Sequence, residues 1–219
     1  MNRLKVKICG ITNAEDARAA VEAGADALGF VFHKPSSRYV SVEVVRQIVA
    51  SLPPFVLPVG VFVNEELKKV RDLMDSCGLA LAQLHGDETA AYCGELGRPA
   101  LKAIRLQSMS SFLAMAEYKG RAQVRGFVLD AFSESAYGGT GQVPDWAWAA
   151  EAARTAPVLL AGGLTPENVR EAILKVRPYG VDVSSGVEAS PGKKNPAKVK
   201  TFIQTVKLVS RELEGYTPQ

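Results

Sequence analysis

The sequence predicts an α/β protein, a single-domain (β/α)₈ barrel with parallel strands that spans residues 1–219. Three observations favour this fold. Eight apolar runs alternate with eight helix-like stretches, most connections between them are short, and glycines or polar residues stand where many different runs end. A barrel brings all these strand ends around one pocket, whereas the alternative, a doubly wound open sheet, gathers only those near its switch point.

The strands are expected where apolar residues run together or alternate with polar ones. They are 4–9, 27–32, 56–63, 79–85, 100–105, 126–130, 158–161 and 181–184. The stretches between them have helical periodicity and predict helices at about 14–23, 41–51, 65–76, 87–95, 108–117, 145–155, 166–176 and 196–212. Pro166 suits a first helical turn, and Gly78 and Gly97 suit helix ends.

The composition is that of an ordinary globular protein, with 47% hydrophobic and 22% charged residues. The formal net charge of +3 is small and the lysines are scattered, which argues against a nucleic-acid partner. Neither a signal sequence nor an apolar run long enough to cross a bilayer is recognisable, so no membrane partner is expected. Cys9, Cys77 and Cys93 lack metal-ligand spacing, and free thiols suit a reducing, cytoplasmic location.

The first strand ends on a candidate catalytic thiol. Its alternation places Leu4, Val6 and Ile8 on one face and Lys7 and Cys9 on the other, inward face. Two strand rises separate Lys7 from Cys9 by roughly 7 Å, and a nearby ammonium favours the thiolate, which is the form that acts as base or nucleophile. The alternative is a cysteine that serves only as a small buried hydrophobic residue.

Candidate ligand-binding residues follow the second and fourth strands. Arg38 lies in the loop after the second strand, where a guanidinium can clamp a carboxylate, although a solvated surface arginine is the alternative. Gln83 and His85 share one strand face, so both are expected to point into the barrel mouth. A structural histidine is the alternative for His85.

Asp130 closes the sixth apolar run and is a candidate general acid, because no helix begins immediately after it. The alternative is a carboxylate that only caps a turn. The loop that follows contains Gly138, Gly139, Thr140 and Gly141, which suit either a mobile lid or an ordinary surface loop.

Two glycine-rich strand ends late in the chain predict a phosphate site. Gly162 and Gly163 follow the seventh strand, and Ser184, Ser185 and Gly186 follow the eighth. Glycines let backbone amides approach an anion, and phosphate commonly binds to the loops after strands seven and eight of such barrels. Either loop alone is equally consistent with a tight turn, but two such loops on adjacent strands favour phosphate.

In order, these strand ends resemble one family, phosphoribosylanthranilate isomerase of the tryptophan pathway. The resemblance covers nearly the whole chain. It rests on Lys7-Ile8-Cys9-Gly10-Ile11-Thr12, Gly29-Phe30-Val31-Phe32, Ser36-Ser37-Arg38-Tyr39-Val40, Gln83-Leu84-His85-Gly86, Leu129-Asp130, Gly138-Gly139-Thr140-Gly141, Ala161-Gly162-Gly163-Leu164 and Val181-Asp182-Val183-Ser184-Ser185-Gly186-Val187-Glu188. The chain departs from the family pattern at Ser37, Pro144 and Asn195, none of which matches a catalytic position.

The resemblance implies an Amadori rearrangement of N-(5-phosphoribosyl)anthranilate without cofactor or metal. The residue matching Cys9 is the family's general base, the one matching Asp130 its general acid, and the one matching Arg38 holds the anthranilate part. The glycine and serine loops hold the phosphate, and we expect Gln83, His85 and Asp182 to contact the phosphosugar substrate.

Two other functions stay open on the sequence. A sugar-phosphate isomerase of the histidine pathway would share the phosphate loops, but it should carry a carboxylate where Cys9 stands. A non-catalytic phosphosugar-binding barrel is the other. The sequence is compatible with either a monomer or a homodimer.

Overall fold

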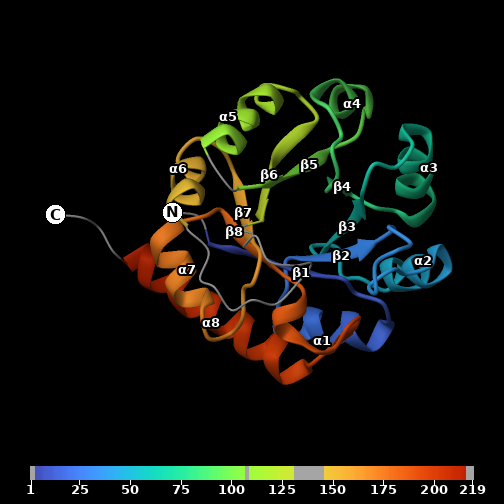
Figure 1. The fold of residues 1–219 in the computed structure, drawn as a ribbon. Coiled ribbons are helices and arrows are strands. Elements are labelled where there is room, and N and C mark those ends of the chain that lie inside the picture. Colours follow the sequence, from blue (N-terminus) through green and yellow to red (C-terminus); the bar gives the residue numbers. More distant parts are fainter. Residues whose placement is uncertain (1–2, 107–108, 131–145, 216–219) are drawn as a thin grey trace.

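The strands close into a barrel that the helices surround (Figure 1). The structure, a computed structural model, describes residues 3–106, 109–130 and 146–215. Within these ranges eight parallel strands join in sequence order, and the eighth pairs with the first. The predicted (β/α)₈ barrel is therefore confirmed, and the open-sheet alternative is wrong.

The elements alternate as the sequence predicts. The barrel strands are β1 (Lys5–Cys9), β2 (Ala27–Val31), β3 (Leu57–Phe62), β4 (Leu81–Leu84), β5 (Ala100–Arg105), β6 (Val124–Asp130), β7 (Val158–Ala161) and β8 (Gly180–Val183). The α-helices of the described ranges are α1 (Ala14–Ala23), α2 (Val42–Ala50), α3 (Leu67–Cys77), α4 (Ala90–Glu95), α5 (Met109–Tyr118), α6 (Ala147–Ala153), α7 (Val169–Val176) and α8 (Pro196–Gly215). None of these helices combines the length and hydropathy that a bilayer-spanning segment needs.

Three local features differ from the prediction. Helix α4 begins at Ala90 instead of residue 87, because Thr89 caps it: Thr89 Oγ1 accepts from Tyr92 N at 3.2 Å. Helix α7 begins at Val169 instead of residue 166, because side-chain hydrogen bonds of Thr165 and Asn168 hold a turn there: Asn168 Oδ1 accepts from Thr165 N at 2.8 Å. After β8 the chain forms a short 3₁₀ helix (Ser185–Val187) and an antiparallel hairpin of β9 (Glu188–Ser190) and β10 (Lys193–Lys194) that were not predicted. This hairpin lies beside the C-terminal strand ends.

Strand alternation divides the core into two layers. Val6 and Ile8 of β1 belong to the large cluster that the barrel forms with its helices. Cys9 packs instead with Val31 and Val61 of the next two strands, inside the barrel. The predicted faces of the first strand are therefore confirmed.

Candidate active site

Lys7 lies inside the barrel next to Cys9 and forms a buried ion pair. Its Nζ donates to Asp182 Oδ2 of the neighbouring β8 at 2.8 Å, and the two side chains are only 2% and 6% exposed. The strands align Lys7 directly with Asp182, so the pairing follows from the β1–β8 register. Each of these buried charges stabilises the other, because a buried charge without a partner strongly lowers the stability of the fold.

Burial controls the protonation of Cys9 more strongly than Lys7 does. Burial raises the pKa of the Cys9 thiol, whereas the positive charges of Lys7 and Lys194 lower it and that of Asp182 raises it further. The net effect is a raised pKa. Lys7 therefore acts in the expected direction on the thiol but does not make Cys9 a thiolate by itself.

Asp130 ends β6 on the inward side of the strand, in alternation with Val128 of the barrel interior. His85 Nε2 lies 3.9 Å from Asp130 Oδ2, and both side chains are about one quarter exposed, at 26% and 27%. Gln83 Nε2 lies 2.8 Å from His85 Nδ1. With the Gln83 amide as donor, Nδ1 accepts and the ring proton sits on Nε2, which faces Asp130.

Two buried side-chain oxygens inside the barrel have no hydrogen-bond partner among the described residues. Asp182 Oδ1 and Gln83 Oε1 have no hydrogen-bond donor among residues 3–106, 109–130 and 146–215. Buried polar atoms are almost always hydrogen-bonded, so these acceptors suit the hydroxyl groups of a ligand. They lie on the strands β8 and β4, whose ends also carry other candidate residues.

Arg38 is bound to a carboxylate of the protein itself. Its Nε and Nη2 donate to Oε1 and Oε2 of Glu188 at 2.8 and 2.7 Å, and its side chain is 27% exposed. Gly10 makes room for it, since a Cβ at that position would lie 2.7 Å from Arg38 Cδ. Lys194 Nζ donates to the same Glu188 at 2.9 Å. The pKa of Glu188 is lowered, because the hydrogen bonds and charges of Arg38 and Lys194 outweigh the opposing effect of burial.

Sequence reasoning did not find Glu188 and Lys194 as functional residues. Glu188 closes the last quoted motif, and Lys194 stands six positions later. The sequence offered one signal for them: both residues closely follow the predicted phosphate loop along the chain. Their pairing with Arg38 depends on the β9–β10 hairpin, which the pattern did not reveal.

The two predicted phosphate loops contact one another. Gly186 packs so closely on the backbone of Leu164 that a Cβ there would overlap the Leu164 carbonyl. Gly163 has a φ of 61°, and a Cβ there would meet no atom within 4 Å, so its backbone faces open space. Ser184 is half-buried and Ser185 exposed. The structure therefore places the loop of Gly162 and Gly163 against the loop of Ser184, Ser185 and Gly186, through the contact of Gly186 with Leu164. The glycines and threonine of the loop after Asp130, Gly138, Gly139, Thr140 and Gly141, lie outside the described residues.

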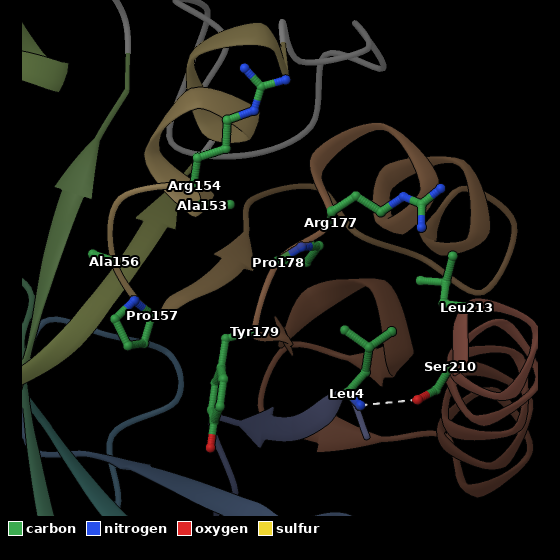
Figure 2. Close-up of a pocket in the computed structure, with 10 residues that line it drawn as sticks. All are labelled: Leu4, Ala153, Arg154, Ala156, Pro157, Arg177, Pro178, Tyr179, Ser210 and Leu213. Atoms are coloured by element: carbon green, nitrogen blue, oxygen red, sulfur yellow. Dashed lines mark hydrogen bonds between the residues drawn. The ribbon is translucent and has the colours of Figure 1, made fainter. Parts of the chain in front are cut away.

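The opposite, N-terminal end of the barrel contains cavities whose lining is mainly apolar. One, of about 410 Å³, lies where Leu4 and Tyr179 precede β1 and β8, and Leu4 N donates to Ser210 Oγ of α8 at 3.0 Å (Figure 2). Another, of about 440 Å³, is lined mainly by apolar residues such as Leu57, Leu159 and Phe55, which is 95% exposed, and it reaches Lys5 and Lys7 of β1. These cavities lie at the other end of β1 from Cys9.

Comparison with known proteins gives consistent matches. A family model described as N-(5'phosphoribosyl)anthranilate (PRA) isomerase matches residues 6–205. The N-(5'-phosphoribosyl)anthranilate isomerase of Citrifermentans bemidjiense is 52% identical over 206 residues, covering 94% of this chain and 98% of the relative.

Solved structures agree with these sequence matches. A phosphoribosyl anthranilate isomerase in complex with reduced 1-(o-carboxyphenylamino)-1-deoxyribulose 5-phosphate is 43% identical, with a TM-score of 0.83, covering 93% of this chain and 98% of that one. A structure of monomers of the dimeric enzyme from Thermotoga maritima is 42% identical, with a TM-score of 0.82 and the same coverage.

Proposed function

The chain belongs to the N-(5'-phosphoribosyl)anthranilate isomerase family, and from that premise we propose how its residues catalyse the reaction. It is an isomerase of tryptophan biosynthesis. It converts N-(5-phosphoribosyl)anthranilate into 1-(2-carboxyphenylamino)-1-deoxyribulose 5-phosphate by an Amadori rearrangement. In the proposal, the whole chain acts as one catalytic domain and the reaction needs one acid and one base.

The observation that carries the proposal is the placement of Cys9 and Asp130. They end β1 and β6, which β7 and β8 separate on the shorter side of the ring, so the two groups stand across the barrel mouth from each other. A substrate between them can receive a proton on one side and lose one on the other. Each positioned acid or base typically contributes about two to four decades in rate.

Asp130 is the proposed general acid. It donates its proton to the furanose ring oxygen as the bond from that oxygen to C1 breaks, and the nitrogen lone pair forms the C1–N double bond of a protonated imine. Cys9 as thiolate then takes the proton from C2, and the C2–H electrons form the C1–C2 double bond of an enolamine. The enolamine tautomerises to the ketone product. The pair His85–Asp130, at 3.9 Å, supports a role for His85 beside the acid.

Binding residues are proposed for each end of the substrate. Arg38 holds the anthranilate carboxylate, and the loops of Gly162, Gly163, Ser184, Ser185 and Gly186 hold the phosphate. The unpaired oxygens of Gln83 and Asp182 accept hydrogen bonds from the sugar hydroxyls between these ends. Fixing both ends holds the sugar in the geometry for proton transfer.

The test is a fluorescence assay with N-(5-phosphoribosyl)anthranilate at low enzyme concentration. We expect its fluorescence to disappear as the carboxyphenylamino product forms, with Cys9→Ser as the matched inactive control. If the wild-type protein leaves the fluorescence unchanged, the non-catalytic phosphosugar-binding barrel is the better reading.

We further infer that the protein works as a homodimer in the cytoplasm and without a nucleic-acid partner. The exposed Phe55 beside an apolar cavity supports association of two N-terminal ends, since large exposed apolar groups commonly mark interfaces. The related Thermotoga maritima enzyme is described as dimeric. The free thiols of Cys9, Cys77 and Cys93 support a reducing compartment.

A further inference from the structure

Lys194 is a completely buried ammonium that the reaction as described does not use. Its side chain is 0% exposed, and Nζ donates to Glu188 Oε1 at 2.9 Å, to Ser184 O at 3.2 Å and to Ser184 Oγ at 3.4 Å. Burial lowers the pKa of Lys194, and its bonds to Glu188 act in the opposite direction. Burying an ammonium costs desolvation free energy, and the carboxylate of Glu188 compensates for this cost.

The hairpin that carries Lys194 is fixed to the start of α1. Lys194 N donates to Asp16 Oδ2 at 2.8 Å, and Thr12 Oγ1 donates to Gly192 O at 2.5 Å. Asp16 in turn accepts from Asn13 Nδ2 at 2.9 Å. These bonds fix the backbone of the hairpin at Lys194. The Glu188 carboxylate lies between Lys194 and Arg38 and accepts hydrogen bonds from both.

The three charges of this cluster do not cancel. Arg38 and Glu188 together are neutral, and a neutral pair has little attraction for an anionic ligand. Lys194 adds one positive charge, so Arg38, Glu188 and Lys194 sum to +1. A positive cluster in a low-dielectric site attracts a carboxylate much more strongly than it would in water.

The contacts also fix which edge of Arg38 is available. Glu188 occupies Nε and one hydrogen of Nη2. Nη1 donates to none of the described residues. A planar guanidinium held along one edge presents its remaining donors in one direction.

We propose that Lys194 is a positioning residue for the substrate's aromatic carboxylate: it holds Glu188, which orients Arg38, and it keeps the three-residue cluster net positive. Lys194 itself does not touch the substrate. This rests on the proposed role of Arg38 as the carboxylate-binding residue.

The test compares two ligands by calorimetry, reduced 1-(o-carboxyphenylamino)-1-deoxyribulose 5-phosphate and its phenylamino analogue without the carboxylate. In Lys194→Met we expect the carboxylate-bearing ligand to bind about tenfold or more weakly, because the cluster becomes neutral. The analogue should weaken less, by only the part that Lys194 contributes through its bonds to Ser184 of the phosphate loop, so the readout is the ratio of the two affinities. Lys193→Met removes an exposed lysine from the same strand and is the matched control, with neither affinity changed.

A double variant separates charge from packing. Glu188→Gln combined with Lys194→Met removes one charge of each sign and leaves Arg38 at +1. We expect it to recover part of the preference for the carboxylate-bearing ligand that Lys194→Met loses, because the net charge returns to +1 while the Glu188 carboxylate that orients Arg38 is gone. Equal weakening of both ligands in Lys194→Met, or no recovery in the double variant, would overturn the proposal in favour of a purely structural lysine.

Arg38→Met distinguishes failure of this inference from failure of the proposed function. Loss of the carboxylate preference in Arg38→Met together with its loss in Lys194→Met supports the proposal. If Arg38→Met keeps the preference, the role of Arg38 is wrong. If Arg38→Met loses it while Lys194→Met keeps it, only the role of Lys194 is wrong.

Discussion

The two ends of the barrel differ in what they bury. At the C-terminal end the ammonium groups of Lys102 and Lys194 are at most 3% exposed, and each is paired with a carboxylate. At the N-terminal end the cavities are lined largely by apolar side chains, and Phe55 stands 95% exposed. The same eight strands supply both ends.

This difference shows where the fold tolerates unfavourable burial. Paired buried charges add little stability compared with apolar packing, whereas removal of one partner is strongly destabilising. In barrels of this kind the chemistry belongs to the C-terminal end and the opposite end serves stability. Substitutions at the two ends should therefore have separable effects.

The largest effect is expected for the proposed acid and base. Cys9→Ser and Asp130→Asn should each lower kcat by about two to four decades, because each removes one positioned proton-transfer group. Calorimetry should show nearly normal binding of the reduced product analogue. Wild-type turnover in either variant would contradict the role assigned to that residue.

Breaking the buried pair inside the barrel should affect stability. Lys7→Met leaves the buried Asp182 without its ammonium partner, and we expect a loss of about 3–5 kcal/mol in the free energy of unfolding. Lys5→Met, on the same strand but 39% exposed, is the matched control and should change it by less than about 0.5 kcal/mol. Urea denaturation measures both, and equal effects would contradict the distinction.

Loss of the guanidinium should act mainly on binding. Arg38→Ala removes charge-assisted hydrogen bonds to the substrate carboxylate, so KM should rise about tenfold to a hundredfold with a smaller change in kcat. Steady-state kinetics measures this split. An unchanged KM would count against a carboxylate clamp at Arg38.

The pH dependence should report Cys9. The base must be deprotonated to act, and burial raises its pKa, so kcat/KM should rise with pH into the range above that of an ordinary thiol. Lys7 lowers the Cys9 pKa, so Lys7→Met should move this rise to higher pH. A pH–rate profile with the same midpoint in both proteins would refute tuning by Lys7.

The smallest effect on turnover is expected at the N-terminal end. Phe55→Glu places a charge on the exposed apolar surface, so light scattering should detect monomers where wild type forms dimers. Its kcat should stay within about twofold of wild type, because Phe55 lies far from the chemistry. A wild-type protein that is already monomeric would disprove the proposed dimer.

Alternation along the strands was sufficient to predict the positions of individual side chains. It placed Lys7 and Cys9 inside the barrel and Gln83 and His85 on a common face, because the side-chain period of a strand is fixed. The barrel followed from the number of strand–helix units and from polar residues at so many strand ends.

Contacts between segments far apart in the sequence could not be predicted from strand periodicity. Arg38 and Glu188 are 150 positions apart, and their contact depends on a two-stranded hairpin whose strands are two and three residues long. The start of α7 was misplaced for a related reason, since side-chain bonds of Asn168 hold a turn where proline favours a helix.

The contact of Gly186 with Leu164 has a consequence for engineering. Because the backbones after β7 and β8 meet there without room for a Cβ, neither loop can be exchanged or randomised alone without disturbing the other. A loop graft that aims to change ligand preference in this barrel should transfer residues 162–168 and 184–188 together, as one interchangeable part.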